Sequence, residues 1–376
     1  RNTSKNDSLY NIYKTEIEEG KNTSNQRVER GKDLIKKYTK YDSIIRSVLN
    51  KDSYSLNDAE KINFKTLDVL DAIDFLKFFK KNSLSIERLE GAIKYYNNRL
   101  KYHINLDFEG RSIVGDDPND INDTNYGNPN VIGPNKDSAD HGTHVSGIIL
   151  SIYDNVKIMT LRAVPDGDEY DKDVALAIRY AANNGAKIIN TSFGKSYSPQ
   201  SDWVYDAIKY AAKKDVLIIN ASGNDSENIN PGLNKTFPND EINGKEIANN
   251  MINVGASTYM YSEDLPAYFT NFGSINVDLF APGYQIYSSI PNNKYDFNSG
   301  TSMAAPSVSG VAAIIRSFYP KLKAPAIKKI LLDSGIPMYN SLNNPGSQEV
   351  VSPENLSKSG KIVNLYNALI LASTTK

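Results

Sequence analysis

The spacing of apolar residues changes in character at about residue 105. Before that point, apolar residues recur every three or four positions between polar ones, for example at Leu67, Leu70 and Ile73. This spacing is typical of amphipathic helices that pack one face and expose the other to water. Ser85 stands where a helix N-cap would, which predicts a further helix over residues 86–103. We therefore expect the region 1–105 to form three to five helices.

From about residue 106 onward, short apolar runs alternate with stretches of helical periodicity. The order strand, helix, strand predicts an α/β domain over residues 106–376, with a parallel sheet covered by helices on both faces. Functional residues of such sheets lie at the carboxyl ends of the strands. The expected strands are 156–164, 186–193, 216–222, 252–256 and 277–280, and the expected helices are 173–184, 202–214, 302–318, 325–333 and 365–372.

Three short segments of this domain hold residue types that suit acyl-transfer chemistry. Residues 140–147 read DHGTHVSG, residues 220–225 read NASGND, and residues 298–306 read NSGTSMAAP. In the first segment, His141 heads an apolar helix beside a glycine, which leaves its ring free to act as a general base. In the second, Asn224 follows a buried strand, where its amide could donate to an oxyanion.

The third segment places Ser302 between a glycine and the start of a helix of small residues. Gly300 allows the backbone of a substrate to approach closely. The free N–H groups and the positive dipole end of the helix favour the negative charge that develops at an acylated serine. Pro306 is expected in the first turn, where a helix tolerates proline.

These three segments together resemble the subtilase family of serine proteases, whose motifs are HGTHV, AxGN and GTSMAxP. They occur in the order of the family and span about 70% of the chain. The resemblance implies a subtilisin-like fold and an endopeptidase in which His141 is the base, Ser302 the nucleophile and Asn224 an oxyanion donor. It implies peptide or protein substrates and no cofactor for the chemistry, with a structural calcium ion as an option.

The resemblance also suggests which segments bind substrate. Residues 190–194 resemble the edge segment of the family, which pairs with extended peptide as an added strand. Residues 221–223 resemble its partner segment, and the two would form the walls of the primary specificity pocket. The expected substrate-binding residues are Ser192, Phe193, Gly194, Ala221, Ser222 and Gly223.

One member of the family's catalytic set has no clear counterpart. The aspartate that orients the histidine should end a central strand and precede Ser or Thr and Gly, but no such segment lies upstream of His141. Asp116 or Asp117 follows an apolar pair, although Pro118 would disturb the expected turn. We favour a separate segment upstream of Arg1 that carries the aspartate, because a sheet without its central strand would leave buried backbone groups unpaired. The region 1–105 would then be an insertion or extension, and an inhibitory propeptide is the less favoured alternative.

Other candidate residues have structural explanations. We expect His144, on the same helix as His141, to be structural, and His103 to have no catalytic role. The acidic run over residues 166–171 lacks the ligand pattern of an EF-hand, so a solvated loop is the first interpretation. A loop that selects basic substrate side chains is the second interpretation, and a calcium site is the third.

Composition narrows the remaining function classes. The 43 basic and 44 acidic residues give a net charge of -1, which offers no global attraction for nucleic acid. No apolar run is long enough to span a membrane. The chain has no cysteine, which excludes disulfides, thiol chemistry and Cys-ligated metal and fits either the cytosol or a cysteine-poor bacterial secreted enzyme. With three histidines, a His-rich metal centre is not expected. With the resemblance, we expect a bacterial protein that is secreted, periplasmic or at the cell surface.

Two further functions compete with the endopeptidase. The first is a non-catalytic subtilase-like scaffold, which the unassigned aspartate suggests, although His141, Asn224 and Ser302 are all present. The second is a dinucleotide-binding enzyme, which is disfavoured because no G-x-G-x-x-G opens a helix.

Overall fold

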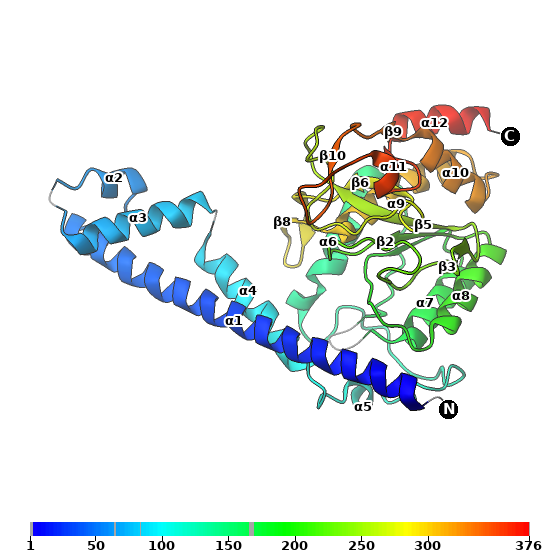
Figure 1. Ribbon diagram of the computed structural model, residues 1–376, viewed down its shortest axis with the longest axis horizontal. Coiled ribbons are helices and arrows are strands. Elements are labelled where there is room, and N and C mark those ends of the chain that lie inside the picture. Colours follow the sequence, from blue (N-terminus) through cyan, green and yellow to red (C-terminus); the bar gives the residue numbers. More distant parts are fainter. Residues whose placement is uncertain (1–2, 64, 83, 165–168, 376) are drawn as a thin grey trace. The chain divides into compact units, whose positions relative to one another are not determined.

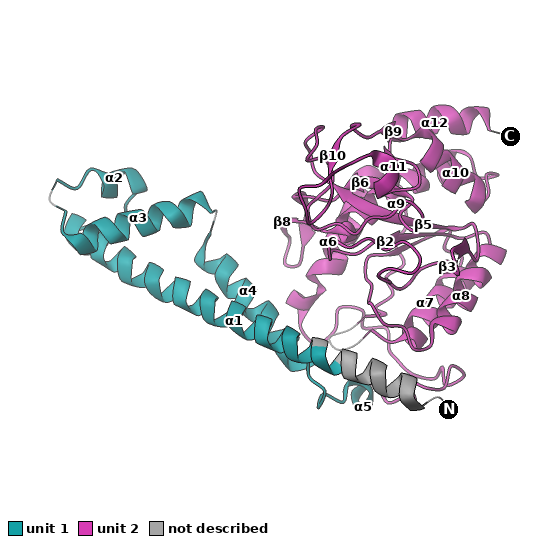
Figure 2. Cartoon of the chain, viewed as in Figure 1, with its two compact units in different colours: residues 1–113, 166–168 teal, residues 114–165, 169–376 magenta. Residues whose placement is uncertain are grey.

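The chain forms two compact units. A computed structural model describes residues 3–63, 65–82, 84–164 and 169–375. The first unit comprises residues 1–113 and 166–168, and the second comprises residues 114–165 and 169–376 (Figure 2).

The first unit is helical in its described part. Ser85 is the N-cap of α4, as predicted, and its hydroxyl accepts a hydrogen bond from the backbone N–H of Arg88 at 3.2 Å. The elements are α1 (Thr3–Leu49), α2 (Leu56–Glu60), α3 (Leu67–Lys81), α4 (Ile86–Asn98), a π-helical turn (Arg99–His103) and α5 (Gly110–Val114) (Figure 1).

A small apolar core joins the helices of the first unit. Gly31 lets α1 approach α4, because a Cβ there would lie 2.9 Å from the side chain of Ile93. Tyr38 of α1 packs on Phe79 of α3 with ring centroids 4.7 Å apart. The predicted face of α3 is only partly buried, since Leu67 remains 75% exposed.

The second unit contains a largely parallel six-stranded sheet, which confirms the predicted α/β class. Its first five strands run parallel, and the last strand is antiparallel to its neighbour. The strand order is β1 (Ile188–Thr191), β2 (Leu217–Ala221), β5 (Met251–Ser257), β6 (Leu279–Pro282), β12 (Lys361–Ile362) and β9 (Ile336–Pro337).

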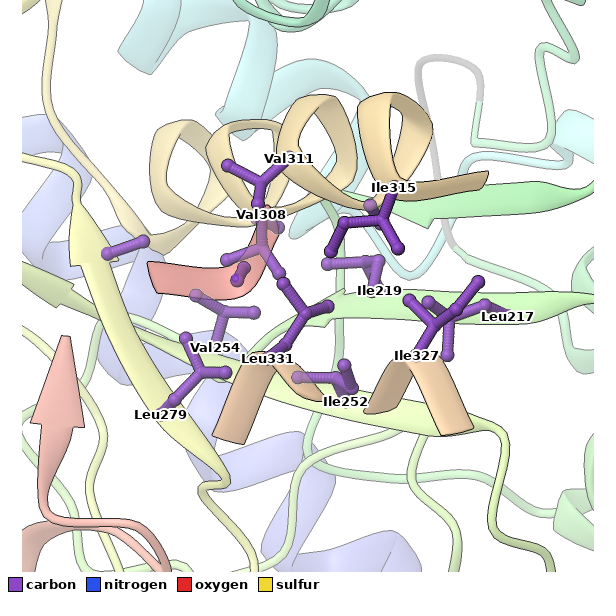
Figure 3. Close-up of a cluster of buried hydrophobic side chains, with 14 of the residues drawn as sticks. Leu217, Ile219, Ile252, Val254, Leu279, Val308, Val311, Ile315, Ile327 and Leu331 are labelled. Atoms are coloured by element: carbon purple, nitrogen blue, oxygen red, sulfur yellow. The ribbon is translucent and has the colours of Figure 1, made fainter. Parts of the chain in front are cut away.

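Helices cover both faces of this sheet. On one face lie α9 (Thr301–Phe318), α10 (Ala324–Ser334) and α12 (Leu365–Thr374), which bury the apolar cluster drawn in Figure 3. On the other face lie α7 (Asp171–Asn183) and α8 (Ser201–Lys213). Because β2 and β5 are buried along their whole length, their apolar runs are continuous rather than alternating.

Shorter elements surround the sheet. The helix α6 (Asp140–Ile152) follows a 3₁₀ turn (Lys136–Ala139) and packs on α9 and β7. The other elements are β3 (Glu241–Ile242), β4 (Lys245–Glu246), β7 (Ile286–Ile290), β8 (Lys294–Asn298), β10 (Leu342–Asn343), β11 (Val350–Val351) and α11 (Pro353–Leu356).

The predicted strand over residues 156–164 is wrong. In the described structure this segment has no regular secondary structure, and its backbone makes only one backbone hydrogen bond, from the N–H of Ala163 to Leu161 O. Ile158 and Met159 are 39% and 41% exposed. The apolar pattern predicts a strand, but a strand forms only beside a neighbour. Among the described residues, β1 pairs with β2 along one edge and with no strand along its other edge.

Candidate active site

Ser302 is held at the start of α9. Gly300 precedes the helix with φ +157° and ψ 161°, a conformation that is essentially confined to glycine. Ser302 is the second helical residue and is half-buried. Its Oγ donates a hydrogen bond to the backbone oxygen of Ser192 at 3.1 Å. Its N–H belongs to the first turn, where helical N–H groups have no partner within the helix.

Pro306 lies one turn later than predicted. It is the sixth residue of α9 and therefore falls in the second turn, where its missing N–H deprives the carbonyl of Ser302 of its helical partner. The hydroxyl of Ser192 replaces that donor, at 2.8 Å from the Ser302 oxygen. Ser192 and Ser302 are thus bonded reciprocally, and the proline is what makes this possible.

His141 is the second residue of α6, which runs parallel to α9. Near their starts, Val145 of α6 shares a cluster with Met303 of α9. Further along, Ile152 lies so close to Gly310 that a Cβ on the glycine would be 2.8 Å away. Because the two helices are parallel and in contact, their N-terminal ends lie side by side. The helix pair therefore brings His141 and Ser302 to the same end of the sheet.

The imidazole of His141 keeps contact with solvent, but protein atoms still surround much of it. This burial lowers its pKa, the carboxylate of Asp140 raises it, and His144 lowers it further. Asp140 accepts a hydrogen bond from the backbone N–H of His141 at 2.8 Å. In the described part of the chain, no carboxylate accepts a hydrogen bond from the ring itself.

Asn224 is oriented by the start of α9. Its Oδ1 accepts hydrogen bonds from the backbone N–H of Thr301 at 2.8 Å and from the hydroxyl of Thr301 at 3.1 Å. That hydroxyl in turn accepts the N–H of Gly223 at 3.1 Å. Since both donors point at one amide atom, that atom must be the oxygen, and Nδ2 is the free donor. Among the described residues, Nδ2 has no acceptor and lies beside Gly300.

The six expected substrate-binding residues lie around this point, but several of their side chains are already used. Ser222 is fully buried, and its hydroxyl donates to the backbone oxygen of Asn271. Phe193 packs against the cluster under α7 and α8. The backbone from Phe193 to Gly194 pairs with no other described backbone group, whereas Lys195 pairs with Phe237. The backbone of residues 193–194 therefore remains available to pair with a substrate, whereas the side chain of Ala221 is buried.

Asp116 does not meet His141. Its carboxylate is fully buried 2.6 Å from the ammonium of Lys172, which also donates to the backbone oxygen of Asp117 at 2.7 Å. Tyr126 lies on the same ammonium, 4.6 Å from ring centroid to nitrogen. Asp116 therefore serves a structural ion pair, and neither aspartate is bonded to the imidazole of His141.

The remaining candidates have structural roles where they are described. His144 is fully buried, and its Nε2 lies 3.2 Å from the backbone oxygen of Asp296. His103 ends the π-helical turn of the first unit. The solvated-loop interpretation is wrong for the described end of the acidic run, because Asp171 is buried and pairs with Lys195 at 2.9 Å. Residues 166–168 lie outside the described residues.

Two residues that orient the site were missed at the sequence level. Thr301 lies within the serine motif, so its hydroxyl could have been considered. Asn271 lies in FTNFG, far from every motif, and only its hydrogen bonds reveal it.

The described residues contain no group of three or more His, Cys, Asp or Glu side chains that could hold a metal ion. Over the same residues, no helix combines the length and apolar character needed to cross a membrane.

The chain is similar to known serine proteases. The chain is 37% identical over 216 residues to the cell wall-associated protease of Bacillus subtilis, covering 54% of this chain and 22% of that protein. It is 37% identical over 192 residues to a thermophilic serine proteinase of Bacillus sp. strain AK1, covering 48% and 43%. The chain thus spans less than half the length of these relatives.

The fold has a counterpart among solved structures. The epidermin leader peptide processing serine protease of Staphylococcus aureus superposes with a TM-score of 0.51 at 23% identity, over 63% of this chain and 64% of that chain. This likeness concerns the fold alone. The model of the subtilase family, Peptidase S8, matches residues 42–357. Because this match spans most of the chain, the protein belongs to the subtilase family of serine peptidases.

Proposed function

We propose that the protein is a serine endopeptidase that cleaves peptide bonds through an acyl-enzyme on Ser302. This proposal rests on the parallel packing of α6 and α9. The N-terminal ends of the two helices lie side by side, which brings His141 to the same end of the sheet as Ser302. His141 accepts the proton of Ser302 as its Oγ attacks the scissile carbonyl. Nδ2 of Asn224 and the N–H of Ser302 stabilise the oxyanion.

The second half of the reaction uses the same groups. The tetrahedral intermediate collapses, the C–N bond breaks, and His141 gives its proton to the leaving amine. Water then attacks the acyl-enzyme while His141 accepts its proton. As the ester bond breaks and the carboxylic acid leaves, His141 returns that proton to Ser302 Oγ. The substrate lies along the unpaired backbone of Phe193–Gly194 as an added strand, which suits extended peptides of any sequence.

A fluorophosphonate probe tests the proposal. The intact protein is expected to take up one covalent label at Ser302, and the Ser302→Ala variant none. Ser307→Ala is the matched control, because Ser307 lies on the same helix and its hydroxyl only bonds Met303 O. A folded protein that takes up no label would support the alternative function, a non-catalytic subtilase-like scaffold.

We also propose that a strand ending in aspartate completes the sheet beside β1 and orients His141. Three observations support this: the open edge of β1, the unpaired and exposed segment over residues 156–164, and the imidazole without a carboxylate partner among the described residues. If residues 156–164 paired as a strand, their connection through α7 to β1 would be a crossover of the kind that links parallel strands of one sheet. One inserted strand would pair with both.

Two measurements on the active protein test this strand. Hydrogen exchange should show protected amides over residues 157–162, because those N–H groups would be bonded to the added strand. Intact-mass spectrometry of the denatured active enzyme should find the strand as a separate peptide or as a continuous extension. A fully active sample that contains only the 41.7 kDa chain would exclude it.

We propose that the protein acts at or outside the surface of a bacterial cell. The similarity to a protein named as cell wall-associated supports this. Fractionation of the producing cells with an antibody against the chain tests it, and recovery only with the cytosol would contradict it.

A further inference from the structure

Asn271 lies behind the candidate oxyanion donor without reaching the reacting atoms. It belongs to the connection between β5 and β6 and is 1% exposed. A buried asparagine must satisfy two donor hydrogens and an acceptor oxygen, so its hydrogen bonds define which backbone it holds.

All its side-chain hydrogen bonds go to the loop around Asn224. Nδ2 donates to Ser222 O at 3.0 Å and lies 3.3 Å from the carboxylate of Asp225. Oδ1 accepts the backbone N–H groups of Asp225 at 2.9 Å and Glu227 at 3.0 Å. The backbone N–H of Asn271 itself donates to Gly223 O at 2.9 Å.

We propose that Asn271 is the positioning residue of the oxyanion site. It grips the residues on both sides of Asn224 and thereby fixes where Nδ2 of Asn224 points. Thr301 orients the amide of Asn224 by a direct hydrogen bond. Asn271 instead holds the backbone of Ser222 and Asp225, on the two sides of Asn224. This inference rests on the proposed function, because it assigns a purpose to Asn271 only if Asn224 stabilises the transition state.

Asn271 and the loop around Asn224 lie so close together that the loop needs a glycine at the point of contact. Gly223 has φ +105°, and a Cβ there would lie 2.3 Å from Nδ2 of Asn271. Only glycine allows both this conformation and this distance. The glycine before Asn224 is therefore needed to let the amide of Asn271 reach the loop.

Asparagine is the side chain that this position requires. Aspartate has the same shape and keeps the acceptor for the two N–H groups, but it would face Ser222 O and the carboxylate of Asp225 with a negative oxygen. Alanine removes all side-chain bonds and leaves both N–H groups without an acceptor.

The test measures kcat and KM of Asn271→Ala and Asn271→Asp on a peptide substrate. We expect kcat to fall by about 10- to 100-fold while KM changes little, since a displaced group of this kind costs up to about 10² in rate. Asn250→Ala is the matched control: Asn250 is fully buried and its Nδ2 donates to Val216 O, but it precedes β5 at the opposite end of the sheet. It should lower stability and leave kcat unchanged.

A double-mutant cycle with Asn224→Ala distinguishes positioning from general loosening. If Asn271 acts through Asn224, its substitution should cost less than about threefold in kcat once the Asn224 amide is gone. An equal loss in both backgrounds would overturn the proposal. So would full activity of both Asn271 variants, or failure of both to fold while Asn250→Ala folds.

The same cycle separates this inference from the function on which it rests. If Asn224→Ala alone leaves kcat unchanged, the oxyanion assignment fails. If Asn224→Ala lowers kcat as expected but the Asn271 variants do not, only the positioning role fails.

Discussion

The two halves of the candidate site differ in how completely they are built. On the serine half, hydrogen bonds join Ser192 to Ser302, Thr301 to Asn224, and Asn271 to the loop around Asn224. On the histidine half, α6 is packed firmly on α9, yet the imidazole of His141 has no carboxylate partner among the described residues. The outer edge of β1 likewise has no paired strand in the part of the chain that the structure describes.

This difference shows that the sheet alone fixes the serine half, whereas the histidine half needs an additional group to orient its imidazole. The serine half lies over β2 and β5, whose backbone groups are paired and buried on both faces. Its functional groups are therefore fixed before any substrate binds. The histidine half lies on α6, which packs on α9 and β7 outside the sheet, and the orientation of its imidazole depends on the strand that we propose.

The largest expected effect comes from removing either reacting group. Ser302→Ala and His141→Ala should each lower kcat by several orders of magnitude, and the double variant should be little worse than either. In subtilisin, a member of the same family, such losses reach about 10⁶ and are strongly non-additive. Steady-state kinetics on one peptide substrate measure all three variants. If the double variant lost the product of both single effects, the two halves would not work as a unit.

Asn224→Ala tests the serine half alone. It should lower kcat by about 10²–10³ with little change in KM, the range found for an oxyanion donor in subtilisin, because the amide stabilises only the transition state. Ser226→Ala serves as control, since Ser226 lies in the same loop and its hydroxyl bonds the exposed Tyr268 backbone oxygen. A pure KM effect would make Asn224 a substrate-binding residue.

The sequence predicted the serine half better than the histidine half for a physical reason. The helix at Thr301–Phe318 and the strands at Leu217–Ala221 and Met251–Ser257 follow from local apolar runs and lie close to their predicted bounds. The segment over residues 156–164 has an equally good pattern but no neighbour to pair with. Apolar periodicity indicates which side chains prefer burial, whereas pairing depends on residues distant in sequence.

Long-range polar contacts could not be predicted from the sequence either. Nothing near Asn271 in the sequence marks it as a partner of the loop around Asn224, which lies more than 40 positions away. The same holds for Ser192, whose hydroxyl replaces the donor that Pro306 lacks. Motifs identify the residues that react, and only the folded backbone identifies those that hold them.

A row of buried polar residues crosses the sheet under the serine half and is joined by hydrogen bonds. The hydroxyl of Thr191 donates to Asn220 at 2.6 Å, and Asn220 donates to Asn253 at 2.9 Å. The backbone N–H of Asn253 donates to the carboxylate of Asp278 at 2.8 Å. The row therefore ends in a charged cluster next to β6.

This cluster holds three carboxylates against two ammonium groups. Lys358 bonds Glu246 and Asp278, and Lys328 bonds Glu246 at 3.0 Å. Asp240 is left 4.0 Å from Lys328, with its Oδ2 buried and without a hydrogen bond. Burial raises the pKa of Asp240 to about 7, and Lys328 only partly offsets this.

Asp240 should therefore make stability depend on pH. Its pKa is higher in the folded than in the unfolded protein, so the folded state binds more protons between the two values. The free energy of unfolding should fall as pH rises from about 4 to 7. Asp240→Asn should remove this slope and add up to about 4 kcal/mol at pH 8, with little change at pH 4, because one pKa unit corresponds to about 1.4 kcal/mol. Urea unfolding at both pH values measures it, and equal effects at both would contradict the assignment.

The smallest expected effect concerns the histidine half and the carboxylate nearest to it. Burial lowers the pKa of His141 and Asp140 raises it, so the acidic limb of kcat/KM should move to lower pH in Asp140→Asn. Activity at pH 7–8 should hardly change, because the imidazole is neutral there in both proteins. Asp137→Asn is the control, since Asp137 lies three residues earlier, accepts a hydrogen bond from Asn292, and is not among the groups that shift the pKa of His141.

The position of the acidic limb in the parent protein also bears on the missing carboxylate. With only the described residues around it, the imidazole should titrate below its ordinary pKa. A second carboxylate against the ring would favour the imidazolium and raise that pKa instead. If the acidic limb of kcat/KM in the parent protein lies above the ordinary pKa of a histidine, and if Asp140→Asn shifts it only slightly, the result would indicate that the proposed strand is in place.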